Sequence, residues 1–355
     1  MAVLRLPNPG SDLDRFVSTF ALIAREADSK PFDLDFMTAT MTKHFQASSM
    51  GAHGEEAVRL STRADRTRDP LFNQSKMYSE LYRMLGWIRS AQDSHSKFTV
   101  TPLGATVMHY HFSAGAATKG LVAESFISAV FPNPSTVNVG IVNHRPFAQL
   151  LKLAFLLGGE ITRDEMIIGV LSLTDDLKPN AIENNAKTIL NLRKKNKSSA
   201  SKLVKEIAKA NNLQVNTLEN YTRLPVAILG SDFLGWGQGV YSNTIYSGKE
   251  KIKVIRLTEA GIKKAKSIIN SNDLRMASID KVNQDERVWL SFYGYYAMAL
   301  RAGIADQEIL NNIEKSGSKI PSLLESLLIS SPELLIFNPS LQEEEEILHL
   351  ASELT

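Results

Sequence analysis

The stretches "KFTVTPLGATVMHYH" (Lys97–His111) and "KVIRLTEAGIKKAKS" (Lys253–Ser267) share one pattern. In each, a short alternating strand ends at a threonine, a glycine follows three residues later, and a helical pattern begins at once. The threonine suits a helix N-cap, because its hydroxyl can accept a hydrogen bond from an exposed backbone N–H. Gly104 and Gly261 would let the new helix approach the sheet closely. The sequence therefore predicts two similar strand-to-helix junctions.

The same order of elements precedes both junctions. A clear helix, "SKMYSELYRML", runs into the strand, turn and strand of "WIRSAQDSHSKFTVT", while "NTLENYTRL" leads through the glycine-rich turn at Gly235–Gly239 to two strands joined by "YSGKEK". Helices followed by a β-hairpin are typical of the winged-helix form of helix-turn-helix. We therefore predict a mainly helical α+β chain of tandem winged-helix units at 1–135 and 136–272, followed by a helical linker region at 273–355.

Composition excludes several classes of protein. The chain has 355 residues, 43% of them hydrophobic, which is enough for two or three domain cores. It has no cysteine, so disulfides, cysteine zinc sites and thiol catalysis are excluded. No run approaches the roughly 20 apolar residues of a membrane span. We expect a cytoplasmic protein that makes no membrane contact.

Residues typical of helix ends predict where several helices begin or stop. Ser11 suits the N-cap of the first helix. A helix should begin at Pro146 and stop before Gly158, because proline favours the first helical turn and glycine the position past the end. Thr162 and Glu165 form a capping box for the next helix. Two further helices are expected in "AIENNAKTILNLRKKNK" and "SASKLVKEIAKANN".

The net charge of +2 hides two basic stretches. Arginine suits guanine and asparagine or glutamine suits adenine, each through two hydrogen bonds to a base edge. In the first stretch, Arg59–Arg89, a solvated surface of paired Arg and Asp side chains would be the simpler interpretation. The candidates for DNA contact there are Arg63, Arg66, Arg68, Asn73, Gln74 and Lys76.

The second basic stretch runs from Arg193 to Lys209. Cations at the end of a helix also favour its dipole, which explains part of the run without any ligand. Neutralisation of several phosphates is the sharper interpretation. The expected phosphate contacts are Arg145, Arg193, Lys194, Lys197 and Lys202, and the helix after them would present base readers that include Asn216, Tyr221 and Arg223.

Catalytic patterns are weak. Asp164, Asp176 and Lys178 satisfy the spacing of a metal-dependent nuclease, but that chemistry favours carboxylates on adjacent strands, and Asp164 falls in a helix. His109 and His111 have no acidic or histidine cluster nearby in the sequence. We therefore predict no catalytic residue and no metal site in this chain.

Several segments resemble AlwI-type type IIS restriction and nicking endonucleases. "NHRPFAQLLKLAFLLGGEITRDEMIIGVLSL" resembles a block of that family, "YSELYRMLGWIRSAQDSHSKFTVTPLGATV" is similar to its first winged-helix unit and to that of the FokI recognition region, and "IKVIRLTEAGIKKAK" resembles the end of the second unit. "SPELLIFNPSLQEEEEILHLASEL" is similar to the helical linker before the family's nuclease domain.

The resemblance implies recognition of an asymmetric double-stranded DNA site by a monomer. It also implies Mg²⁺-dependent cleavage by a separate PD-(D/E)xK nuclease domain or subunit, whose motif we do not find in this chain. Two alternatives stay open. One is a tandem winged-helix transcription regulator that dimerises through its C-terminal helices, including "RVWLSFYGYYAMAL"; the other is a complete nuclease using Asp164, Asp176 and Lys178.

Overall fold

The structure, a computed structural model, describes residues 2–270 except 9, 11, 50–51, 62–68, 92–93, 114, 130, 132–139, 142–143 and 249. These residues form two compact units. We call residues 15–128 the Trp87 unit, and residues 2–14 together with 129–270 the Trp236 unit. The predicted N-cap Ser11 and the predicted linker region 273–355 lie outside the described residues.

The N-terminal segment belongs with the second of these units. The Leu4 N–H donates to the Leu171 carbonyl at 2.8 Å, and Leu4 and Leu6 are buried. The predicted boundaries at 135 and 272 stay predictions.

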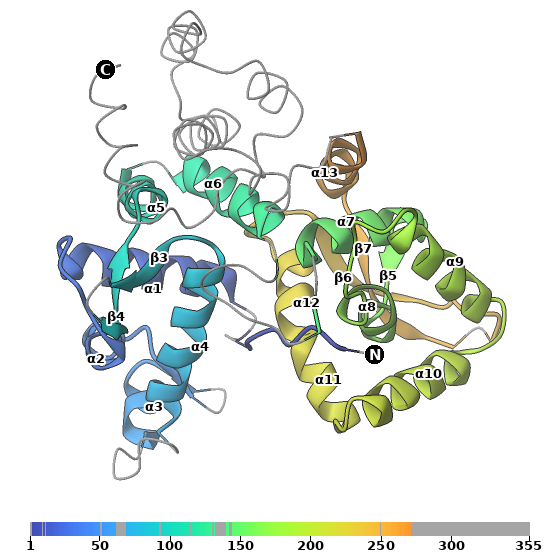
Figure 1. Cartoon of the computed structure of the whole chain (residues 1–355), viewed down its shortest axis with the longest axis horizontal. Helices are drawn as coiled ribbons and strands as arrows, with labels where there is room; N and C mark the ends of the chain where they lie inside the picture. Colours follow the sequence, from blue (N-terminus) through green and yellow to red (C-terminus); the bar gives the residue numbers. More distant parts are fainter. Residues whose placement is uncertain are drawn as a thin grey trace, which may run out of the picture. The chain divides into compact units, whose positions relative to one another are not determined.

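The Trp87 unit combines helices with two small antiparallel hairpins (Figure 1). Its elements are α1 (Leu13–Ala27), α2 (Leu34–Lys43), β1 (Ser48–Ser49), β2 (Ala52–His53), α3 (Glu55–Leu60), α4 (Pro70–Met84), β3 (Ile88–Ala91), β4 (Ser94–Val100), α5 (Pro102–Ser113) and α6 (Gly115–Ser128). An aromatic cluster forms the core: the ring of Phe16 lies 4.7 Å from that of Tyr82, and Phe20 lies 4.9 Å from Trp87. Burial of these large rings is the main driving force for packing α1 on α4.

In its described residues, the Trp236 unit places seven helical segments and a π-helical turn around one sheet. Its elements are α7 (Pro146–Leu156), β5 (Glu160–Ile161), α8 (Arg163–Met166), the π turn η1 (Ile167–Leu171), α9 (Ala181–Arg193), α10 (Lys197–Ala210), α11 (Val215–Tyr221), α12 (Arg223–Gly230), β6 (Gly237–Ser242), β7 (Ile252–Leu257) and α13 (Glu259–Asn270). The strand order is β5-β7-β6, with antiparallel pairs that include Gly239 opposite Ile255. The mixed helical fold with small antiparallel sheets was predicted. The short strand β5 was not.

Both predicted junctions are confirmed. The Gly104 N–H donates to Thr101 Oγ1 at 3.0 Å, and that hydroxyl donates to the Gly86 carbonyl at 2.5 Å. In the Trp236 unit, the Gly261 N–H donates to Thr258 Oγ1 at 3.2 Å.

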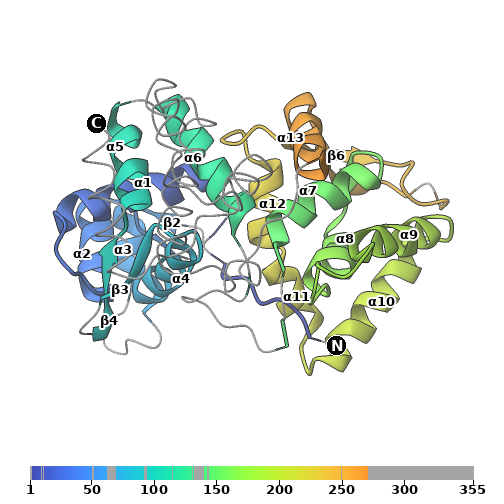
Figure 2. The same cartoon turned by 45° about the horizontal axis from the view of Figure 1, so that its top comes forward.

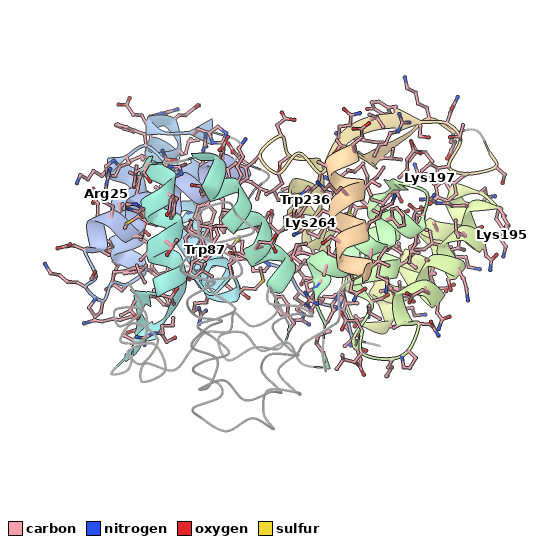
Figure 3. All side chains as sticks on the ribbon, turned by 90° about the horizontal axis from the view of Figure 1, so that it is seen from above. Arg25, Trp87, Lys195, Lys197, Trp236 and Lys264 are labelled. Atoms are coloured by element: carbon pink, nitrogen blue, oxygen red, sulfur yellow. The ribbon has the colours of Figure 1, made fainter. Side chains whose placement is uncertain are left out.

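Each junction also contains a tryptophan in the same position. Each threonine N–H donates to a tryptophan carbonyl at 3.0 Å: Thr101 to Trp87, and Thr258 to Trp236. Figure 3 shows Trp236 beside α13. A Cβ at Gly104 would lie 2.1 Å from the Trp87 carbonyl oxygen, and one at Gly261 would lie 1.9 Å from that of Trp236. Only glycine fits this approach in either unit.

The predicted capping box of α8 is also confirmed. The Thr162 hydroxyl accepts from the Glu165 N–H at 3.2 Å, and the Glu165 carboxylate accepts from the Thr162 N–H at 2.9 Å. The following turn, Ile167–Leu171, is wholly buried. No described helix is long and apolar enough to cross a membrane.

Candidate nucleic-acid interface

A row of lysines lines the outer face of α10. Ala200, Val204 and Ile207 are buried on its inner face. Lys202, Lys205 and Lys209 are exposed and follow each other at spacings of three and four residues, so they share one face of the helix. We call these three residues the lysine stripe. Three exposed cations on one rigid helix can neutralise phosphates without regard to sequence.

A four-residue turn joins α10 to α11. It begins at Asn211, the C-cap of α10, passes through Asn212 in the left-handed conformation (φ 54°), and ends at Gln214, the residue before α11. Figures 1 and 2 show the two helices meeting at an angle at this turn. Two helices joined by so short a turn are neighbours in space.

Three polar residues share the exposed face of α11 and the start of α12. Asn216, Asn220 and Arg223 are exposed at spacings of four and three residues, while Leu218 is fully buried. We call them the polar face. Asn216 and Arg223 were predicted as base readers, and both carry groups that can form two hydrogen bonds to a base edge. Tyr221, also predicted, is half-buried.

The predicted phosphate contacts around the end of α9 fall into two groups. Lys194 and Lys197 are exposed, and Figure 3 shows the neighbouring Lys195 at the outer edge of the unit. Arg193 is different: its predicted phosphate contact stays a prediction, but its guanidinium has partners within the protein. Its guanidinium binds Glu165 Oε1 at 2.7 Å and Oε2 at 2.9 Å, and it also donates to the carbonyls of Leu157 and Glu160 at 2.8 and 2.6 Å. These bonds use four of the five N–H donors of the guanidinium.

Tyr246 completes the network around Glu165. Its hydroxyl donates to Glu165 Oε1 at 3.4 Å, and only 4% of the residue is exposed. Burial raises the pKa of the Tyr246 phenol, and the nearby Glu165 carboxylate raises it further. The next residue, Ser247, donates through its hydroxyl to the Lys194 carbonyl at 2.9 Å. The loop after β6 is thus fastened to the end of α9.

The first basic stretch lies only partly within the described residues. Lys76 is exposed and Asn73 is half-buried on α4. Gln74 is 7% exposed, and its side-chain amide donates to the Tyr78 hydroxyl at 3.2 Å. Its predicted contact with DNA stays a prediction. The remaining three candidates, Arg63, Arg66 and Arg68, lie outside the described residues.

Arg145 and Asp176 serve the packing of α7. Arg145, a predicted phosphate contact, is 5% exposed, and its backbone N–H donates to Asp176 Oδ2 at 3.0 Å. Gln149 donates to the same oxygen at 2.9 Å. Arg145 is thus buried at the start of α7, and its predicted phosphate contact stays a prediction.

The same contacts argue against the nuclease constellation. The Asp176 carboxylate is buried and engaged at the start of α7, whereas Asp164 accepts a hydrogen bond from the Ser201 hydroxyl at 2.9 Å. The two carboxylates thus serve different partners. Within the described part of the chain, no group of three His, Asp or Glu side chains lies where it could hold a metal ion.

The β6–β7 hairpin adds exposed groups that the sequence analysis missed. Tyr241 is 64% exposed, pairs with Lys253 across the hairpin, and has the Lys251 ammonium 5.1 Å from its ring centre. The alternation in "KIKVIRL" could have indicated the two exposed lysines, because Lys251 and Lys253 lie on either side of the buried Ile252. Arg256 follows in the same strand, but it pairs with Glu160 at 2.6 Å.

Comparison with known proteins finds similarity only among solved structures. No protein-family model and no curated protein sequence matches this chain. A solved structure of the restriction endonuclease FokI bound to DNA is 13% identical, with a TM-score of 0.40, over 100% of this chain and 60% of that one. A second FokI structure is also 13% identical, with a TM-score of 0.39, over 98% of this chain and 60% of the other. The chain thus spans 60% of the length of the FokI structures.

Proposed function

We propose that this chain is a sequence-specific double-stranded DNA-binding module that reads a short asymmetric site through two winged-helix units. In the Trp236 unit, α10 and α11 would form the helix-turn-helix and the β6–β7 hairpin the wing. The observation that carries the proposal is the polar face of α11, Asn216, Asn220 and Arg223, which directly follows the lysine stripe of α10. The lysines would bind the phosphates of the DNA backbone, and the amide and guanidinium groups of the polar face would form hydrogen bonds with base edges.

The resemblance of the sequence to AlwI-type enzymes extends the proposal. The module would then be the recognition part of a type IIS restriction or nicking endonuclease in a restriction-modification system. Cleavage would come from a Mg²⁺-dependent nuclease domain or subunit outside the described residues. Two dissimilar units in one chain suit an asymmetric site, because they need no two-fold axis, so we expect one chain to bind one site.

A selection experiment tests the proposal. The chain is incubated with a random duplex pool and Mg²⁺, and both bound and cut ends are sequenced. We expect a short asymmetric motif in intact DNA. A palindromic motif bound by a dimer would favour the transcription regulator, whose dimer segment lies outside the described residues. Absence of any enriched motif would refute sequence-specific binding.

The lysine stripe allows a sharper test. Replacing Lys202, Lys205 and Lys209 together by Gln should weaken binding to every duplex and lower the dependence of log affinity on log salt by about 0.9 for each lysine that holds a phosphate. Lys178, Lys187 and Lys266, also exposed, provide a control with the same loss of charge. An equal effect of both triple variants would mean that only net charge matters.

A further inference from the structure

A pocket of about 420 Å³ opens in the Trp236 unit between α8, the first turn of α10 and strand β7. Met166, Val226 and Ile255 give it an apolar lining. Met166 and Ile255 are buried, whereas Val226 is half-buried and so partly open to the pocket. The volume lies within the range of about 300–1,000 Å³ that small-molecule sites occupy.

One wall of the pocket is aromatic and firmly held. The Tyr246 ring lines it, and the Tyr246 hydroxyl points to Glu165, which Arg193 grips through two hydrogen bonds. Ser247 fixes the next position to the end of α9. Because only 4% of Tyr246 is exposed, the residue forms a fixed wall of the pocket.

The mouth of the pocket is cationic. Arg163, Lys197 and Lys253 come from α8, α10 and β7, and all three are exposed. Across the described ranges, none of their side chains forms an ion pair or hydrogen bond. Asp164 lines the same pocket, and one of its oxygens accepts from Ser201. Three cations thus face one carboxylate.

We propose that this pocket takes a single unstacked nucleotide of the bound DNA, with the base in the apolar lining beside Val226 and its flanking phosphates at Arg163, Lys197 and Lys253. The inference rests on the proposed function. Cations from three elements suit the two phosphates on either side of one nucleotide. The second oxygen of Asp164 can accept from the exocyclic amino group of adenine, cytosine or guanine, whereas it would repel the carboxylate of a fatty acid.

Duplexes that differ at one position test this. One carries a single unpaired adenine, a second an abasic residue at the same place, and a third is fully paired. Because an unpaired base is already free of its partner, little energy is needed to expose it. Anisotropy titrations should show about tenfold tighter binding to the unpaired adenine than to the paired duplex, and no gain for the abasic one.

Two variants in the pocket, with one control outside it, assign the gain to the pocket. Val226→Phe fills the pocket and should remove the gain while leaving affinity for the paired duplex unchanged. Val100→Phe, the same change at a half-buried position of the Trp87 unit, should keep it. Lys253→Gln changes an exposed side chain, so it should not affect folding, and it should reduce the gain in affinity for the unpaired adenine.

The outcomes separate this inference from the proposed function. Equal affinity for paired and unpaired duplexes, or the same gain for the abasic one, would overturn the nucleotide pocket and leave DNA binding intact. If the pocket bound free deoxyadenosine monophosphate but the unpaired adenine gave no gain, its ligand would be a free nucleotide and not a nucleotide of the bound DNA. This result would overturn the inference. Failure to bind any duplex would refute both.

Discussion

Arg193 and Glu165 form a two-bond ion pair at the junction of α8 and α9, with Nε–Oε1 and Nη2–Oε2 distances of 2.7 and 2.9 Å. The side chains are 12% and 1% exposed. The pair links the end of α9 to the N-terminus of α8, and two further bonds from Arg193 reach the carbonyls of Leu157 and Glu160 before and within β5. One side chain at the end of α9 therefore contacts the end of α7, strand β5 and helix α8.

Arg193→Ala should lower the free energy of unfolding of the Trp236 unit by about 3–5 kcal/mol, because it leaves a buried carboxylate without its partner. Urea unfolding monitored by tryptophan fluorescence measures this. Lys195→Ala, two residues on and exposed, should change stability by less than about 0.5 kcal/mol. If both variants unfolded at the same urea concentration, the structural role of Arg193 would be refuted.

The close approach of Gly104 and Gly261 to tryptophan carbonyls gives a second prediction. Gly104→Ala and Gly261→Ala should each destabilise the protein by about 1–3 kcal/mol or more, since the new methyl group meets backbone that cannot yield easily. Gly115→Ala and Gly248→Ala are matched controls, because a Cβ at either position meets no atom within 4 Å. Thermal unfolding of the four variants checks the contrast, and equal melting temperatures would contradict the shared junction.

The threonine of each junction can be tested through its hydroxyl. Thr101→Val keeps the shape but removes the cap of α5 and the bond to the Gly86 carbonyl, so it should cost about 0.5–2 kcal/mol. Thr101→Ser keeps the hydroxyl and should be close to the original protein. The measured quantity is the difference in unfolding free energy between the Val and Ser variants, and a difference of zero would remove the capping role.

The junctions were predictable because their signal is local. Thr101 and Gly104 are three residues apart, and the hydrogen bond that they form follows from the spacing alone. A further local signal went unused: "LGW" occurs at Leu85–Trp87 and again at Leu234–Trp236, and both tryptophan carbonyls receive the threonine N–H. The tripeptide would have marked the start of each hairpin.

Features that the sequence analysis did not predict depend on distant partners. Arg193 stands in a basic run that ends a helix, and nothing nearby in the sequence separates it from Lys194; its partners lie 28 to 36 residues earlier. Strand β5 has two residues, too few for any alternation, and it exists because β7 pairs with it. Gln74 is polar on a helix that also exposes Lys76, and only tertiary packing makes it buried.

Tyr246 predicts a dependence of stability on alkaline pH. Burial holds its pKa above the ordinary value of 10.0, so the unfolded chain loses this proton at lower pH than the folded protein does. The stabilisation from neutral Tyr246 is complete below about pH 10 and is lost as pH rises through the folded pKa. Tyr246→Phe should flatten the fall in urea midpoint between about pH 9 and pH 11. Tyr241→Phe, at an exposed tyrosine, is the control and should leave the curve unchanged.

Substitutions on the polar face of α11 can distinguish base-specific contacts from nonspecific electrostatic attraction to DNA. Asn216→Ala or Arg223→Ala should lower affinity for the selected site by about 1–3 kcal/mol and relax the preference at one position of that site. Lys202→Ala, on the lysine stripe, should weaken all sequences alike and leave the selected motif unchanged. Repeating the selection with each variant compares the two patterns directly. If Asn216→Ala and Lys202→Ala gave the same motif and the same loss of affinity on unrelated DNA, α11 would contact only the backbone, and the base-reading surface would have to be sought on another element.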